Sequence, residues 1–386
     1  MKIVVASDSF KGSLTSAQVA EAVRKGIVEV MPECDVCTVS VADGGEGTVE
    51  ALVDTLGGDF VELEVAGPMM EPVVARYAVL DDRETAVLEM SSASGLFLVP
   101  KSIRNPLIAT TLGTGHMVCD ALGRGCRKFL VGIGGSATND GGMGMLEALG
   151  FRFLDKDGVE LRGCGESLAR VEKIDVSGVP AEVYESEFIV ACDVDTPFCG
   201  ADGAAQVFAP QKGADAQMVD ELDGGMRHFA EVVLAATGVD VSDMPGAGAA
   251  GGLGGAFVAF LGARLERGVE MVLDTVGFDG LLDGADLVIT GEGRIDSQTF
   301  KGKTPYGVAK RAAKFGIPVW AIGGSVQVDD HEALGFERLA SISPKRECPL
   351  DFLMRREIAS DNVRRTVADM LQKSIFWKKS LKIEID

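Results

Sequence analysis

Short hydrophobic runs recur along the chain, and each one ends in a stretch of glycine and polar residues. Residues 2–6, 35–41, 129–133 and 287–290 are runs of this kind, and the first is followed by a segment at 15–30 with apolar residues at helical spacing. Runs of this length are typical of buried strands, and strands that alternate with amphipathic helices indicate a parallel sheet. The pattern therefore predicts an α/β protein.

Local signals refine these elements. Thr15 and Gln18 have the spacing of a capping box and predict the start of the helix at 15–30. Residues 151–179 show glycine and serine turns without clear periodicity, so we expect an irregular segment. Residues 246–255 are rich in glycine, and we expect a loop there that leads into a buried helix.

The charge of the chain restricts its partners. Among 386 residues, 37 are Lys or Arg and 58 are Asp or Glu, which gives a net charge of −21. A surface this negative repels phosphate backbones, so we expect no nucleic-acid partner. An anionic substrate would need local lysines and a divalent cation to overcome the global field. The length allows two domains of ordinary size.

No segment has the pattern of a membrane span or a signal peptide. The longest uncharged window, residues 244–263, is interrupted by glycines and a proline, and the apolar run at the first residues is short. The eight cysteines are scattered, and Cys34 and Cys37 form an isolated C-x-x-C pair that lacks the context of a zinc or redox site. We expect a cytoplasmic protein with no membrane partner.

The most informative stretch is VGIGGSATNDGG at residues 131–142, between a predicted strand and a helix at 143–149. A strand that opens through glycines into a helix exposes backbone N–H groups to an anion, and Ser136 and Thr138 add hydroxyls, while Asp140 adds a possible metal ligand. The stretch is neither a Walker A loop nor a dinucleotide fingerprint. It is either an anion site or a tight glycine-rich turn.

Acidic and basic residues follow other predicted strands. Asp8, Ser9 and Lys11 follow the first strand, Asp43 follows the second, and Asp193 follows the apolar run that ends at Cys192. Ligands of open α/β sheets gather outside the carboxyl ends of strands. Each of these groups also has a structural interpretation: a solvated lysine, acids at a helix start, or a turn before a proline.

A second informative stretch, GEGRIDSQTFKGKT, occupies residues 291–304. Its carboxylates, Glu292 and Asp296, and its lysines, including Lys301, are the groups that a site for a metal–nucleotide complex needs. The alternative is a solvated charged loop. Arg104 has the planar fork that matches a carboxylate, although an arginine on the surface is the more common case.

Six motifs occur in an order that resembles the bacterial glycerate kinase family, and the resemblance spans roughly residues 1–370. The motifs are DSFKGSL at 8–14, DGGEGT at 43–48, GGSATNDGG at 134–142, FAPQKGA at 208–214, GAGAAGG at 246–252 and GEGRID at 291–296. The resemblance implies two different α/β domains, one inserted in the other, with the active-site cleft between them. It implies a restriction-endonuclease-like domain at 1–65 and 285–386 and a flavodoxin-like domain at 66–284.

The resemblance also implies a reaction. Members of the family transfer the γ-phosphoryl group of ATP to a hydroxyl of D-glycerate, with Mg²⁺, and 2-phospho-D-glycerate is the expected product. A kinase that forms 3-phosphoglycerate and a non-catalytic protein that binds small acids are the alternatives. Small molecules are the expected partners.

The resulting hypothesis gives each candidate residue a role. Asp193 is the expected base, with Glu292 and Asp296 as alternatives for the base or the metal. The full assignment places catalysis on Asp193, Lys11 and Asp296, phosphate and nucleotide binding on Gly134, Gly135, Ser136, Thr138, Asn139 and Lys301, substrate binding on Ser9, Arg104 and Asp43, and metal binding on Glu292 and Asp296.

Overall fold

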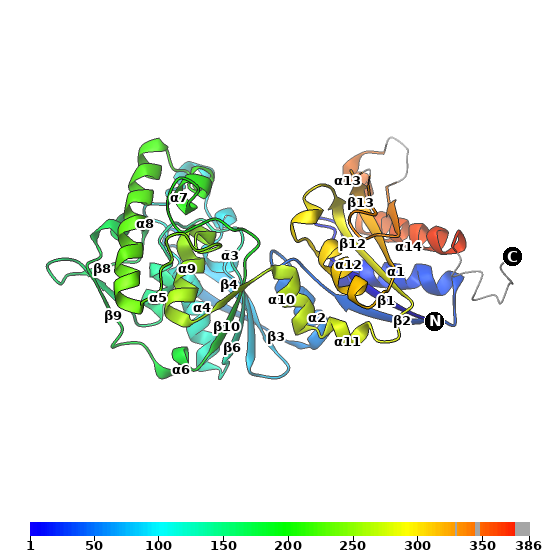
Figure 1. Ribbon diagram of the computed structural model, residues 1–386, viewed down its shortest axis with the longest axis horizontal. Helices are drawn as coiled ribbons and strands as arrows, with labels where there is room; N and C mark the ends of the chain where they lie inside the picture. Colours follow the sequence, from blue (N-terminus) through cyan, green and yellow to red (C-terminus); the bar gives the residue numbers. More distant parts are fainter. Residues whose placement is uncertain (329, 344–347, 375–386) are drawn as a thin grey trace. The chain divides into compact units, whose positions relative to one another are not determined.

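The computed structural model describes residues 1–328, 330–343 and 348–374, except for the side chain of Lys301. The fold is mixed α/β and divides into two compact units (Figure 1). Unit 1 contains residues 1–43, 50–56 and the chain from 269 onward, and unit 2 contains residues 44–49 and 57–268.

Unit 1 is built on a five-stranded parallel sheet in the order β14-β13-β12-β1-β2. Its strands are β1 Lys2–Ser7, β2 Asp35–Ser40, β12 Leu287–Ile295, β13 Val319–Val326 and β14 Arg338–Ser341. Its helices are α1 Ser16–Val30, most of α2 Thr48–Leu56, α10 Gly268–Thr275, α11 Phe278–Leu281, η5 Thr299–Lys301, α12 Thr304–Lys314, α13 Leu350–Leu353 and α14 Arg356–Gln372.

The strand order of unit 1 bears on which domain is flavodoxin-like. Counted along the chain within this sheet, the order is 2-1-3-4-5, which is the order of flavodoxin-like folds. The resemblance placed the flavodoxin-like domain at 66–284 instead. Strand order depends on pairing between segments that are far apart in the sequence, and the local pattern of either domain is only that of alternating strands and helices.

Helices cover the sheet of unit 1 on both faces. The connections from β1 to β2 and from β12 to β13 run in opposite directions along the sheet, so right-handed crossovers place α1 and α12 on opposite faces. Helix α14 packs beside α1, as the red and blue helices of Figure 1 show. Their apolar residues form one core with β1, β12 and β13.

Unit 2 contains a six-stranded mixed sheet in the order β11-β10-β6-β5-β4-β3 and a separate small sheet in the order β8-β7-β9. Strands β5, β6, β10 and β11 are parallel, whereas β3, β4 and β5 pair antiparallel. The strands are β3 Gly58–Ala66, β4 Pro72–Leu80, β5 Thr85–Glu89, β6 Lys128–Gly132, β7 Arg152–Leu154, β8 Glu160–Leu161, β9 Lys173–Asp175, β10 Glu187–Ala191 and β11 Arg264–Glu266.

Most helices of unit 2, though not η1, η2 and η4, contribute to an apolar core with this sheet. The helices of unit 2 are α3 Ser91–Ser94, η1 Leu96–Leu98, η2 Lys101–Ile103, α4 Leu112–Gly123, α5 Met143–Ala148, η3 Gly165–Arg170, α6 Ala181–Tyr184, α7 Ala204–Phe208, η4 Pro210–Lys212, α8 Ala216–Thr237 and α9 Ala249–Leu261. No helix within the described ranges is long and apolar enough to cross a membrane.

Two local expectations differ from the structure. The stretch 291–295 was expected to be a loop, but β12 continues through it because its residues pair in parallel with β13. The segment 151–179 was expected to be irregular, but it contains the small sheet of β7, β8 and β9. Strands of two or three residues are too short to give a period in the sequence. The helix at 15–30 is confirmed, with its capping box between Thr15 and Gln18.

Candidate active site

The predicted site residues fall into two groups, one in each unit, and most of them follow the carboxyl ends of strands. Unit 1 contains Asp8, Ser9, Lys11, Asp43, Glu292, Asp296 and Lys301, and unit 2 contains Arg104, Gly134, Gly135, Ser136, Thr138, Asn139 and Asp193.

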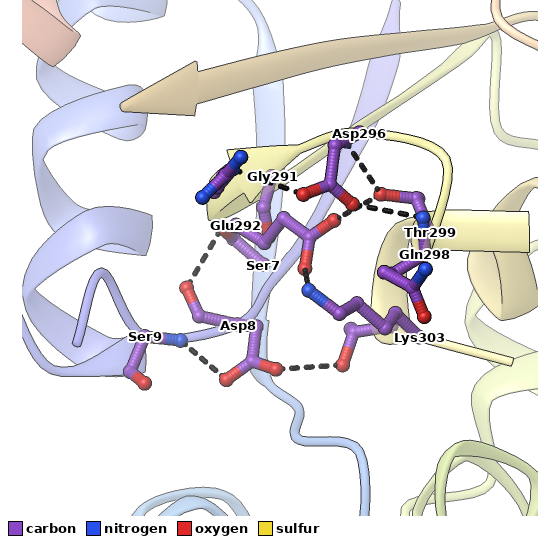
Figure 2. A network of polar contacts seen from close by, with 11 residues as sticks. Ser7, Asp8, Ser9, Gly291, Glu292, Asp296, Gln298, Thr299 and Lys303 are labelled. Carbon is purple, nitrogen blue, oxygen red and sulfur yellow. Dashed lines mark hydrogen bonds and ion pairs between the residues drawn. The ribbon is translucent and has the colours of Figure 1, made fainter. Parts of the chain in front are cut away.

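Asp8 and Glu292 lie where the strand order of unit 1 changes direction. Asp8 directly follows β1, and Glu292 lies near the carboxyl end of the neighbouring β12, where Ser7 is opposite Gly291 (Figure 2). The loops after β1 and β12 lead to opposite sides of the sheet and leave a crevice outside the strand ends. This topological switch point is where α/β sheets of this kind bind their ligands.

The carboxyl group of Asp8 is buried at this point. It accepts a hydrogen bond from the backbone N–H of Ser9 at 2.6 Å and another from the hydroxyl of Thr304 at 2.9 Å. Burial is the largest influence on its pKa, and together with the charge of Asp43 it raises the pKa to about 7. A carboxyl group with this pKa exchanges protons at neutral pH, which is the property of a general acid or base.

Glu292 is also buried, and its two carboxylate oxygens have different partners. Oε1 accepts a hydrogen bond from the hydroxyl of Thr299 at 2.6 Å, and Oε2 forms an ion pair with Lys303 at 3.2 Å (Figure 2). Burial raises the pKa of Glu292, while Thr299 and Lys303 act in the opposite direction. The side chain therefore anchors the segment that leads from β12 to α12.

The predicted magnesium ligands do not form a prepared metal site. Asp296 pairs with Arg294 at 2.9 Å and accepts a hydrogen bond from the backbone N–H of Gln298 at 2.8 Å, while Glu292 is engaged by Lys303. Within the described residues, no cluster of three or more His, Cys, Asp or Glu side chains is arranged to hold a metal ion. The donors around these carboxylates already neutralise them, so the residues do not fit a resident Mg²⁺ ion.

Among the other predicted residues of unit 1, Ser9 and Asp43 act directly on Asp8. Ser9 contributes its backbone N–H to that carboxylate, and the charge of Asp43 acts on it. Lys11 is exposed, and its ammonium group has no hydrogen bond or ion pair with any residue of the described ranges. The side chain of Lys301 lies outside the part of the structure that is described.

In unit 2, the loop after β6 presents an open backbone. Gly134 and Gly135 are exposed, and Gly135 has a φ of +75°, a conformation that favours glycine. A Cβ atom at Gly134 would meet nothing within 4 Å. In the described structure the backbone N–H groups of these two glycines donate no hydrogen bond. Free N–H groups at a strand end are suited to bind an anion.

Beneath this loop lies a buried lysine to which the sequence analysis assigned no role. Nζ of Lys212 donates to the hydroxyl oxygen of Ser136 at 2.8 Å and to the carbonyl oxygen of Thr138 at 2.6 Å. Burial lowers the pKa of Lys212 to about 7, against the opposing charge of Asp140. Because the Ser136 oxygen accepts from Lys212, its own proton is free to be donated outward. The signal in the sequence was the motif FAPQKGA, which includes Lys212.

Three other residues of the loop face the interior. Asp140 is fully buried, and its carboxylate accepts hydrogen bonds from the backbone and hydroxyl of Thr111, both at 2.7 Å, and from two glycine N–H groups. The expectation that Asp140 supplies a metal ligand does not fit this environment. Thr138 and Asn139 are fully buried too, and the Asn139 amide contacts Met226.

Asp193 lies at the same edge of the sheet as the loop, because β10 pairs in parallel with β6. Its side chain is exposed, and Oδ1 accepts a hydrogen bond from the backbone N–H of Gly268 at 3.2 Å. The guanidinium of Arg267 donates to the Asp193 carbonyl oxygen at 2.8 Å. The residue is thus positioned, although it lacks the burial that perturbs Asp8.

Two further side chains at this end of unit 2 hold the backbone. Arg104 donates to the carbonyl oxygens of Val99 at 3.1 Å and Leu96 at 3.3 Å, so part of its donor capacity is used within the protein. Glu89, at the end of β5, had no predicted role. Its Oε1 accepts from three consecutive backbone N–H groups, including that of Thr48 at 2.9 Å, at the start of α2.

Comparisons with known proteins identify the family of the chain. The family model described as the glycerate kinase family matches residues 3–374. A glycerate kinase from Bacillus subtilis is 48% identical over 96% of this chain and 97% of its own length, and a glycerate 2-kinase from Escherichia coli is 48% identical over 85% of this chain and 86% of its own. A crystal structure of a candidate glycerate kinase 2 from Salmonella typhimurium LT2 superposes with a TM-score of 0.89, at 44% identity, over 96% of this chain and 97% of the other.

The matches cover nearly the whole of both partners, and they include every motif at the two strand-end groups. The chain therefore belongs to the glycerate kinase family and is, like the enzymes for which that family is named, a phosphotransferase.

Proposed function

We propose that the protein transfers the γ-phosphoryl group of ATP to the 2-hydroxyl of D-glycerate and so forms 2-phospho-D-glycerate. The observation that carries this proposal is the switch point of unit 1, where a carboxyl group with a pKa near neutrality lies beside a buried carboxylate–lysine pair. Phosphoryl transfer needs positioned cations and a group that accepts the hydroxyl proton. The relative from Escherichia coli is named a glycerate 2-kinase, which favours the 2-hydroxyl.

Within this proposal, residues of the two units have separate tasks. The open N–H groups of Gly134 and Gly135, with the Ser136 hydroxyl, would bind an anionic group of a substrate. The exposed ammonium of Lys11 would contact phosphate oxygens. Magnesium would enter with the nucleotide, and when bound it supplies neutralising charge to the phosphates.

The base has two candidates, Asp193 from the resemblance and Asp8 from the structure. We favour Asp8, because its pKa of about 7 makes it a stronger base than an ordinary carboxylate and because Ser9 and Thr304 fix its orientation. If Asp8 is the base, Asp8→Asn lowers kcat by about 100-fold or more with little change in the KM for ATP. Asp193→Asn is the matched comparison, and a larger loss of kcat in that variant would return the role to Asp193.

The reaction itself is tested by phosphorus NMR of the product formed from ATP, Mg²⁺ and D-glycerate. The proposal expects a single phosphomonoester on the 2-hydroxyl. A signal of 3-phosphoglycerate would support the kinase activity but would show that the 3-hydroxyl is phosphorylated instead of the 2-hydroxyl. Glycerate-independent ATP hydrolysis, or binding of glycerate without turnover, would instead support the small-acid-binding alternative.

A further inference from the structure

Unit 1 contains a cavity of about 320 Å³ at the carboxyl edge of its sheet. Its lining comes from the loops or ends of four neighbouring strands, β1, β12, β13 and β14, and from α13 and the first turns of α14. The cavity is therefore next to the switch point at which Asp8 and Glu292 lie, and all of its lining belongs to one compact unit.

The walls of the cavity are mostly apolar. Ile342, Leu353, Met354 and Ala359 line it together with Phe10. Two of the three serine hydroxyls in the wall are engaged within the protein, since Ser13 donates to the backbone oxygen of Met354 at 2.8 Å and Ser343 to that of Gly324 at 2.6 Å. Ser325 and Asn362 are the other uncharged polar side chains of the lining. An occupant of this space must therefore present an apolar body.

Two cationic side chains also line the cavity, and both are close in sequence to the switch-point carboxylates. Lys11 follows Asp8 by three residues, and Arg294 follows Glu292 by two. Arg294 is held by its ion pair with Asp296, whereas the exposed Lys11 has no such partner in the described structure. The cavity thus combines an apolar wall with a positive charge on the side of the strand ends.

Of the two reactants in the proposed reaction, only one fits this combination. Glycerate is a three-carbon acid with polar groups on every carbon, so burial in an apolar cavity would leave those groups without partners. Adenine is a flat, largely apolar ring joined through ribose to phosphates, and pockets for such ligands are apolar clefts of roughly 300–1,000 Å³ with a few polar groups. Nucleotides also bind outside strand ends at a switch point.

We propose that this cavity is the subsite for the base of the nucleotide, with the adenine ring against Ile342, Leu353 and Met354 and the phosphates directed toward Lys11. The assignment rests on the proposed kinase function. It separates two contributions to nucleotide affinity: apolar contact with the base, from the wall, and charge attraction to the phosphates, from Lys11.

Leu353→Trp fills the cavity from α13 and tests the wall, and Lys11→Met tests the charge. Binding of ADP, adenosine and tripolyphosphate to the full-length protein is measured by calorimetry. Leu353→Trp should weaken the binding of ADP and of adenosine at least about tenfold and leave the binding of tripolyphosphate unchanged. Lys11→Met should weaken the binding of ADP and of tripolyphosphate and leave the binding of adenosine unchanged. Asn362→Phe fills the cavity from α14 and should repeat the Leu353→Trp pattern.

The control is Leu122→Trp in α4, which fills a second cavity, of about 360 Å³, in unit 2. It should bind all three ligands as the wild type does. If both cavity-filling variants keep wild-type affinity for ADP while the wild type phosphorylates glycerate, the base lies elsewhere and the kinase function stands. If the wild type binds no ATP or ADP and has no kinase activity, both proposals are wrong.

Discussion

At the scale of single residues, burial gives Asp8 a pH-dependent contribution to stability. In the native state its pKa is about 7, mainly because of burial, whereas an ordinary aspartate titrates near 3.8. Between these values the native protein binds more protons at this site than the unfolded chain does. The contribution of Asp8 to the free energy of unfolding therefore falls as pH rises from about 4 to 7.

Asp8→Asn removes this contribution. Between pH 5 and 7.5 the slope of the unfolding free energy against pH should be less negative in the variant than in the wild type, by up to about 1.4 kcal/mol per pH unit. At pH 8 the variant should be more stable than the wild type. Urea denaturation of the ligand-free protein across this range measures it. Asp202→Asn, at an exposed position, is the control, and parallel curves for Asp8→Asn and the wild type would refute the prediction.

For Lys212 we expect a substitution to change substrate binding without lowering stability. In Lys212→Met the loop loses two hydrogen bonds, to Ser136 and Thr138, while a buried charge is replaced by an apolar side chain of similar length. The substitution leaves the Thr138 carbonyl oxygen without this donor, but it also removes an ammonium group whose burial is unfavourable, so the two effects on stability oppose each other. We expect the KM of the substrate bound at this loop to rise about tenfold or more with an unchanged or higher Tm. An unchanged KM with a lower Tm would show a purely structural role; Lys101→Met is the exposed control.

At the scale of elements, one arginine joins three helices of unit 1. Arg311 on α12 is buried and contacts Glu270 and Asp274 on α10 and Asp279 on α11, at distances of 2.5 to 3.0 Å. These carboxylates raise the pKa of the guanidinium, so it remains charged. A single side chain thus joins α12 to α10 and α11.

Arg311→Met should lower the free energy of unfolding by about 2 kcal/mol, below the range for fully buried ion pairs because the partners are partly exposed. Arg365→Met, which removes an exposed pair with Asp361 on α14, should cost less than about 0.5 kcal/mol. Denaturant unfolding of the two variants compares them directly. If both variants lose the same free energy of unfolding, the contact of Arg311 with three carboxylates stabilises the protein no more than an exposed ion pair does.

At the scale of the whole molecule, the net charge of −21 opposes every anionic reactant. Glu292 and Asp296 are already paired with Lys303 and Arg294, and no cluster of three or more His, Cys, Asp or Glu side chains is arranged to hold a metal ion in the described structure. In the proposed reaction, we therefore expect the neutralising cation to arrive with the nucleotide.

Removal of divalent cations should consequently separate activity from folding. We expect EDTA to abolish turnover, and the rate to return in proportion to the concentration of the magnesium–ATP complex. A metal ion that binds only to the native state raises the Tm. Because we expect no resident Mg²⁺ site, the Tm of the ligand-free protein should not change with EDTA or with added Mg²⁺. A rise in Tm with Mg²⁺ in the absence of nucleotide would demonstrate a resident site.

The sequence by itself determined the features that depend on near neighbours. The capping box at Thr15, the alternation of strands and helices, and the positions of acidic and glycine-rich loops after strands are all encoded within a few residues. Each follows from backbone geometry and local hydrogen bonding, which a linear pattern records.

Tertiary structure alone decided the features that depend on distant pairing. The order of strands in unit 1 and the burial of Asp8 follow from segments almost 300 residues apart that meet in one sheet, and the extension of β12 through residue 295 follows from its pairing with β13. Lys212 reaches the Ser136 loop across 76 residues of chain. The burial of a side chain, and with it its protonation, depends on the residues that surround it in space. These residues are not its neighbours in the sequence.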